Sequence, residues 1–220
     1  MTFDGFPDDG LVFYEGLEAD NSKTYWTNHR ATYESCVRAP MQSLLAELVP
    51  DFGPGKLFRP YRDVRFSHDK TPYKTHQGAV VEPEGRGGGA WYVEISADGL
   101  HVAGGSWRME SDQLARYRRA VVDDVQGPRL RAEVTRLRQA GWNLGGDQMV
   151  RLPRGFETPD DGRAELLRYR SLHVGRRWDP SDWLHSREVL DRVRTSWRDV
   201  VALNTWLTDN VGATAQERRR

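Results

Sequence analysis

Residues 91–107 read WYVEISADGLHVAGGSW, and this stretch decides the fold that the sequence predicts. Two runs that contain β-branched and aromatic residues flank Asp98-Gly99, a dipeptide typical of tight β-hairpin turns. We therefore expect two antiparallel strands, over residues 91–98 and 100–107.

Two more strands are expected before this hairpin. Residues 56–66 alternate in a strand pattern, and residues 74–82 form a second run of strand-like sequence. Pro60 has no backbone N–H to donate, so the first of these strands is expected at a sheet edge or with a bulge. Residues 67–73, which include Pro72, are expected to form the turn between the two strands.

Apolar side chains recur at helical spacing towards both ends of the chain. Asn21-Ser22 is a favourable helix start, and Pro40 either interrupts a helix or begins the next one. The expected helices cover residues 7–19, 22–37, 40–49, 110–125, 128–140, 160–169 and 179–210. Residues 171–178 are expected to be a strand or extended segment, and 141–156 to contain a short strand.

The sequence therefore predicts an α+β fold with a central, mainly antiparallel sheet and helices from both chain ends packed on it. We expect a single domain over residues 1–211, because no internal repeat or long linker divides the chain. Residues 212–220 are expected to form a disordered, Arg-rich tail.

The composition excludes several classes of protein. The chain has 220 residues, equal numbers of basic and acidic side chains, and one cysteine, Cys36, which cannot form an intramolecular disulfide. The N-terminal residues lack the features of a signal peptide, and no apolar run is long enough to span a bilayer. We expect a cytoplasmic protein without a membrane partner. Zero net charge also disfavours non-specific nucleic-acid binding.

Residues 59–76 concentrate positive charge in this otherwise neutral chain. The stretch holds five basic side chains and two acidic ones, and two of the chain's four lysines lie here, four residues apart. Arginine forks and lysine ammonium groups suit a phosphate or a carboxylate, while a tyrosine and a histidine add hydrogen-bonding and proton-carrying groups. The predicted ligand-binding residues are Arg59, Arg62, Arg65, Lys70, Tyr73, Lys74 and His76, with Arg154 as a further arginine for the same site. The sequence therefore predicts binding of a small anionic ligand.

Two other interpretations of the same residues stay open. Asp63 and Asp69 can pair with the basic side chains, and the motif is then a purely structural ion-pair network. Alternatively, Tyr61, Phe66 and Tyr73 can stack nucleic-acid bases among the cations, which defines a nucleic-acid or protein interaction module.

Catalytic signatures are absent from the sequence. It contains no G-x-S-x-G motif, and its six histidines show none of the spacings typical of a zinc site. We therefore expect neither a metal nor a cofactor, and whether the protein is an enzyme stays undecided. If a reaction occurs, Asp63 and His76 are the best candidates for a general base. The oligomeric state does not follow from the sequence.

Residues 59–78, RPYRDVRFSHDKTPYKTHQG, resemble the signature of a family of conserved hypothetical proteins, the domain of unknown function numbered 2461. The helix around Asn21–Tyr33, the WYVEIS…GLHVAGG hairpin and the LPRGF…ELLRYRSL segment resemble this family as well. The resemblance implies a single-domain architecture over most of the chain and directs attention to the central motif. It implies no particular activity.

Overall fold

The computed structural model describes residues 2–65, 68–82, 87–156 and 162–216. Within these ranges the strands form one sheet in the order β1-β2-β3-β4-β6-β5, and the pairs at both edges are antiparallel. The strands are β1 (Gly55–Leu57), β2 (His76–Val81), β3 (Ala90–Ser96), β4 (Gly99–Ser106), β5 (Asn143–Gly145) and β6 (Leu172–Trp178). The predicted α+β class with a central antiparallel sheet is confirmed, and β3 and β4 form the predicted hairpin across Asp98-Gly99.

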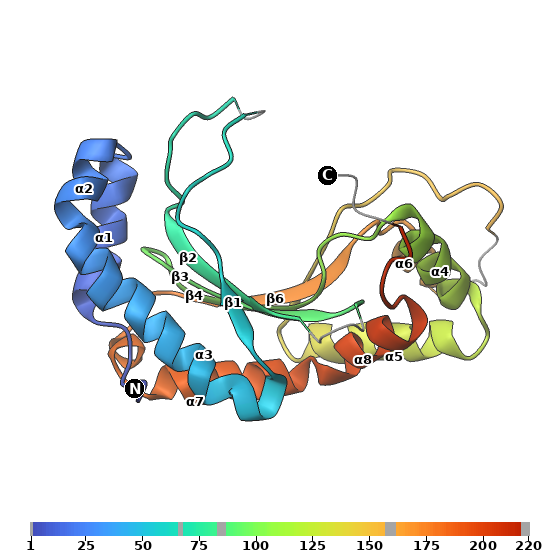
Figure 1. Ribbon diagram of the computed structural model, residues 1–220. Coiled ribbons are helices and arrows are strands. Elements are labelled where there is room, and N and C mark those ends of the chain that lie inside the picture. The colour runs from blue at the N-terminus through green and yellow to red at the C-terminus, as the bar shows by residue number, and fades with distance from the viewer. Residues whose placement is uncertain (1, 66–67, 83–86, 157–161, 217–220) are drawn as a thin grey trace. The chain divides into compact units, whose positions relative to one another are not determined.

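Helices occupy every region in which the sequence predicts them (Figure 1). They are α1 (Asp8–Ala19), α2 (Lys23–Thr32), α3 (Ala39–Phe52), α4 (Ser111–Val122), α5 (Gln126–Gln139), α6 (Arg163–Leu167), α7 (Glu188–Asp199) and α8 (Val201–Asn210), with a π-helical turn η1 (Tyr33–Arg38) and a 3₁₀ turn η2 (Asp182–His185). Pro40 lies in the first turn of α3, and the helical backbone continues into α3 directly from η1. Pro40 therefore lies at the start of a helix, but no break separates this helix from the turn before it.

The chain folds into two compact units, which are described separately. Unit 1 comprises Met1–Val81, Tyr92–Val102 and Arg177–Thr195, and unit 2 comprises Glu82–Trp91, Ala103–Arg176 and Ser196–Arg220. The single domain over residues 1–211 stays a prediction.

Part of the expected C-terminal tail contacts α4 within unit 2. The Thr214 hydroxyl and the Ala215 backbone N–H donate to the carboxylate of Asp112, at 2.8 and 2.9 Å. The Gln216 side-chain amide donates to the Ser111 hydroxyl at 2.6 Å. The last four residues of the expected tail lie outside the described residues.

Unit 1 has a core in which N-terminal helices meet the sheet. Helix α3 contacts both β1 and β2. Its buried residues Met41, Leu44, Leu45 and Leu48 recur at helical spacing and so form one apolar face. Alternate residues of the strands are buried on the core side of the sheet, namely Ala79, Val81, Val93, Ile95, Leu100 and Val102. The other side of these strands carries the polar residues described below.

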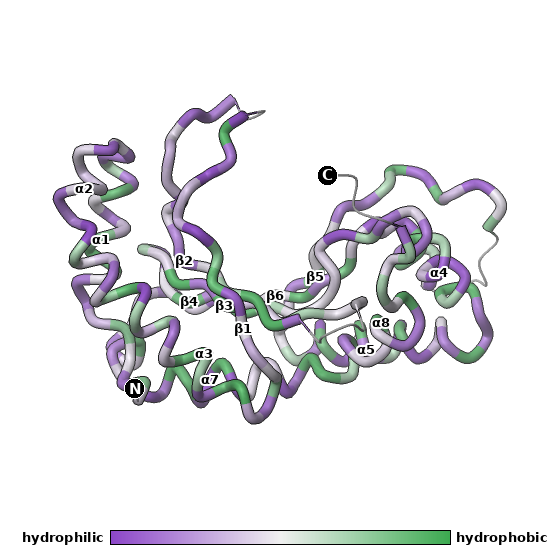
Figure 2. Tube along the Cα trace, in the orientation of Figure 1, coloured by the Kyte–Doolittle hydropathy of each residue, from purple (hydrophilic) through white to green (hydrophobic). Residues whose placement is uncertain are grey.

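The segment between β1 and β2 is a long hairpin that rises from the sheet, and it is mostly hydrophilic (Figures 1 and 2). The prediction of a strand over residues 56–66 was wrong, because β1 ends at Leu57. Beyond it, Arg62 N donates to Pro72 O at 2.9 Å and Lys74 N donates to Pro60 O at 2.8 Å. A proline on each side removes the donors that a continuous ladder needs. We call residues 58–75 the 58–75 hairpin; within it, Phe66 lies outside the described residues.

Candidate functional site

Two of the predicted ligand-binding arginines form ion pairs inside the 58–75 hairpin. Arg62 Nη1 lies 2.6 Å from Asp69 Oδ2 and donates to the Thr71 hydroxyl at 2.7 Å. Arg65 binds both carboxylate oxygens of Asp63, at 2.9 and 2.6 Å. Hydrogen bonds from Arg65 lower the pKa of Asp63 to about 2. Asp63 is thus held as a carboxylate in a solvent-exposed pair, which makes it a poor general base.

Lys70 and Tyr73 also have partners within unit 1. Lys70 Nζ donates to the backbone carbonyl of Val64 at 2.9 Å. The buried Tyr73 ring stacks on Trp26, with ring centroids 4.4 Å apart and an angle of 8° between the planes. The Asn21 side-chain amide bonds to the backbone N–H and C=O of Tyr73 at 3.1 and 3.0 Å. Tyr73 therefore anchors the hairpin to α2 and offers no free ring face for a nucleic-acid base.

The polar side of the unit 1 sheet gathers side chains from three strands and from the hairpin. We call this group the polar cluster; it consists of Phe58, Lys74, His76, Tyr92, Glu94 and Arg177. Gly78 on β2 leaves space for it, because a Cβ at this position would lie 2.5 Å from the Tyr92 hydroxyl. The ring of His101, on β4, meets the Tyr92 ring edge-on at 5.8 Å.

Glu94 lies at the centre of the polar cluster, and only 8% of its surface is exposed. The Tyr92 hydroxyl donates to its Oε2 at 2.5 Å. His76 Nε2 lies 3.6 Å from the same oxygen, and Arg177 Nη1 lies 3.7 Å from Oε1. Burial, and then Glu94, raise the pKa of Tyr92 well above its usual value, so the phenol stays protonated and serves as a donor. The carboxylate thus has three partners from three different strands.

The polar cluster has an excess of positive charge. Burial lowers the pKa of His76; Glu94 opposes this shift, whereas Lys74, Arg177 and Arg62 reinforce it. The imidazole therefore faces three cations and one carboxylate and favours its neutral form. Burial, followed by Arg59, likewise lowers the pKa of the Lys74 amine. Its Nζ lies over the Phe58 ring, 5.1 Å from the centroid, and forms no ion pair with a carboxylate of the described residues.

The ligand-binding residues that the sequence predicts therefore lie in several different parts of the structure. Lys74 and His76 belong to the polar cluster, and Arg59 acts on Lys74 through its charge. Arg62, Arg65 and Lys70 are engaged within the hairpin, whereas Arg154 is an exposed residue of unit 2. The ligand-binding role of all these residues stays a prediction.

Sequence reasoning missed Tyr92, Glu94 and Arg177. The only local signal was a glutamate inside the otherwise apolar run WYVEIS, where a buried carboxylate requires partners. Nothing in the sequence pattern connects it to Arg177, which lies on β6.

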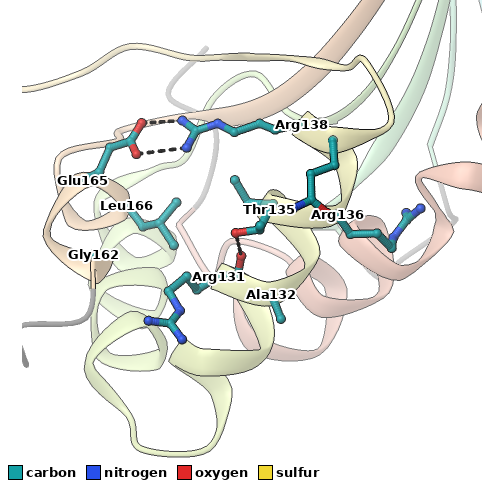
Figure 3. Close-up of a pocket in the computed structure, with 10 residues that line it drawn as sticks. Arg131, Ala132, Thr135, Arg136, Arg138, Gly162, Glu165 and Leu166 are labelled. Carbon is teal, nitrogen blue, oxygen red and sulfur yellow. Dashed lines mark hydrogen bonds and ion pairs between the residues drawn. The ribbon is translucent and has the colours of Figure 1, made fainter.

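A depression lies in unit 2 between α5 and α6, with a volume of about 640 Å³ (Figure 3). Two of its arginines have acidic partners: Arg138 binds both oxygens of Glu165 at 3.1 and 2.5 Å, and Arg136 pairs with Glu133 and Asp199. Because these two charges are neutralised, the depression is a weaker candidate for an anion than the polar cluster.

Within the described part of the chain, no group of three or more His, Cys, Asp or Glu side chains is placed to hold a metal ion. None of the helices described there has the length and apolar character needed to cross a membrane.

The fold and the polar cluster define an α+β protein with a buried, partnered carboxylate on one sheet face. The profile of a family described as conserved hypothetical protein (DUF2461) matches residues 9–206, which is most of the chain. The chain belongs to this family. No curated protein and no solved structure shows significant similarity to it.

Proposed function

We propose that the chain binds a small anion, bearing a phosphate or a carboxylate group, at the polar cluster of unit 1. The observation that carries this proposal is the charge around His76, where Lys74 and Arg177 face a single carboxylate, Glu94, while the third cation nearby, Arg62, is paired with Asp69. Uncompensated positive charge among partly buried side chains attracts an anion more strongly than an exposed ion pair does.

Lys74 is the central ligand-binding residue in this proposal. Its ammonium group is half-buried, and no carboxylate of the described residues pairs with it. Arg59 and Arg177 supply further positive charge, and the neutral imidazole of His76 can donate one hydrogen bond to an anionic oxygen. Arg62, Arg65 and Lys70 shape the hairpin in this proposal, because their donors are engaged by Asp69, Asp63 and the Val64 carbonyl.

Lys74→Met tests the proposal, because methionine keeps the apolar stem and removes the charge. We expect the affinity for inorganic phosphate or citrate, measured by titration calorimetry, to fall about tenfold or more, as is typical for a lost charge-assisted hydrogen bond. Lys56→Met is the matched control, because Lys56 is an exposed residue of β1 outside the cluster. Equal affinity of wild type and Lys74→Met would contradict the proposal.

Glu94→Gln should have the opposite effect. Glutamine keeps an acceptor for the Tyr92 hydroxyl and removes the negative charge that opposes the lowering of the His76 pKa. We expect the affinity for the same anions to rise about threefold to tenfold, because one repulsive charge is lost. A weaker affinity, in a variant that melts at the wild-type temperature, would show instead that the carboxylate itself contacts the ligand.

A further inference from the structure

Residues 147–149 and 168–170 form a short antiparallel pairing within unit 2, centred on Gln148 and Tyr169. Its backbone hydrogen bonds run from Met149 N to Arg168 O at 2.8 Å and from Arg170 N to Asp147 O at 2.7 Å. Side chains alternate between two faces along each segment, so the neighbours of the central pair share one face. These neighbours are Asp147, Met149, Arg168 and Arg170.

The arginines on this face differ in their partners. Arg170 Nη2 lies 2.6 Å from Asp147 Oδ2, so these two charges compensate each other. Arg118, from α4, reaches the same face, because its Nη2 donates to the Met149 sulfur at 3.0 Å. Neither Arg118 nor Arg168 forms an ion pair with a carboxylate of the described residues. Two positive charges therefore stay uncompensated beside Met149.

Both of these guanidinium groups also hold a donor without an acceptor. The Nε atoms of Arg118 and Arg168 are buried and have no hydrogen-bond partner within the described residues. Buried polar groups in folded proteins are nearly always paired, so such donors favour an acceptor from a ligand. The side chains as a whole are only half-buried, so part of each is open to solvent.

The donors of Arg118 have the geometry that binds an oxyanion. Nε and Nη2 lie on one edge of a guanidinium group, and this edge binds two oxygens of a carboxylate or phosphate through parallel hydrogen bonds. Arg65 binds Asp63 through the same edge, at 2.9 and 2.6 Å. At Arg118 the edge meets only the Met149 sulfur, which is a weak acceptor on a flexible side chain.

We propose that Arg118 and Arg168 form a second anion site, which binds the phosphate group of a phosphate monoester. Two phosphate oxygens take the place of the Met149 sulfur at the Nε–Nη2 edge of Arg118, and Arg168 supplies the second charge. A phosphate monoester carries about two negative charges at neutral pH and so matches two uncompensated arginines, whereas a monocarboxylate matches one. The inference goes beyond the proposed function, because this site lies in unit 2 and shares no residue with the polar cluster.

Calorimetry with glycerol phosphate tests the inference in the Lys74→Met variant, which lacks the central residue of the polar cluster. We expect this variant to bind glycerol phosphate, and the addition of Arg118→Met or Arg168→Met to lower the affinity about tenfold or more. Arg119→Met is the matched control, because Arg119 is an exposed arginine of the same helix, and it should leave the affinity unchanged. Unchanged affinity after Arg118→Met, or acetate binding as tight as that of glycerol phosphate, would overturn the site.

Melting temperatures distinguish a ligand site from a structural contact. Without ligand, Arg118→Met should melt no lower than wild type, because it removes a buried donor that has no acceptor. Met149→Leu keeps the volume and removes the sulfur, so it should bind glycerol phosphate at least as tightly as wild type. A lower melting temperature of Arg118→Met together with weaker binding by Met149→Leu would overturn the site in favour of a structural contact.

The two proposals fail in different ways. Binding that Lys74→Met loses and Arg118→Met keeps would overturn the second site and leave the polar cluster standing. Binding that Lys74→Met keeps in full and Arg118→Met loses would support the second site and overturn the proposed function.

Vesicles that contain phosphatidic acid present the same phosphate group on a lipid surface. Tighter binding to glycerol phosphate would support a soluble ligand, and tighter binding to vesicles a lipid headgroup, provided that Arg118→Met loses it. Vesicle binding that Arg118→Met retains would overturn a lipid headgroup as the ligand of this site.

Discussion

Replacing Trp26 by alanine is expected to lower the free energy of unfolding by about 3–5 kcal/mol, the range typical of a large aromatic removed from a core. The indole is 5% exposed. Its ring stacks on Tyr73 and lies 4.8 Å from the ring of Tyr33 and 5.8 Å from that of Phe13. Alanine would leave a cavity in this aromatic group, and rigid rings fill such a space poorly.

The same substitution should also weaken anion binding, because Tyr73 is the residue before Lys74 and its ring is positioned by Trp26. Urea denaturation measures the stability, and calorimetry with phosphate measures the affinity. Trp26→Phe is the control, since it keeps a ring against Tyr73 and should cost markedly less stability. A loss of less than about 1 kcal/mol in Trp26→Ala would show that the hairpin is anchored elsewhere.

Arg163→Met is expected to destabilise the chain by about 3 kcal/mol through a different mechanism. Arg163 is 3% exposed, and its Nη1 donates to the backbone carbonyls of Val121, Val122 and Asp123 at 3.3, 3.3 and 2.9 Å. These carbonyls lie at the C-terminal end of α4, where the helix itself supplies no donors and where a positive charge is favourable. Methionine fills a similar volume but leaves them without this donor.

Arg119→Met provides the matched control for Arg163→Met. Arg119 is exposed in the last turn of the same helix, so its replacement should change stability by about 0.5 kcal/mol or less. The urea midpoints of both variants are compared with wild type. Equal midpoints for the two variants would show that the buried guanidinium is not what stabilises the end of α4.

The prediction of the β3–β4 hairpin is confirmed, whereas the prediction of a strand over residues 56–66 was wrong. The two outcomes have related reasons. Asp98-Gly99 specifies a turn through the conformational freedom of Gly99, whose φ is +96°, so the local sequence is sufficient. In the 58–75 hairpin, the alternation was visible and a second strand over residues 74–82 was expected, but the pairing between the two segments was not visible. Pro60 and Pro72 lie on segments that face each other across the hairpin, and each lacks the backbone N–H that the ladder needs. The ladder is interrupted because both facing segments lack a donor.

For the charged side chains of the basic segment, too, one part could be predicted from the sequence and another part depended on the fold. Sequence patterns located the basic segment and placed Lys74 and His76 among eight candidate ligand-binding residues, because a local excess of charge is visible in one stretch of residues. Which cations are engaged became visible only in the folded hairpin, where Arg62 pairs with Asp69 and Arg65 with Asp63.

The fold class, the helices, the central hairpin and the place of the basic segment could be predicted from local sequence, because periodicity, turn chemistry and charge act over a few residues. The contacts of Glu94 with His76 and Arg177 depend instead on how distant segments come together in the fold. Neighbouring strands lie about 4.8 Å apart, so side chains from distant parts of the chain come within reach once the strand register is set. That register is fixed by the burial of whole strand faces, which no single stretch of sequence encodes.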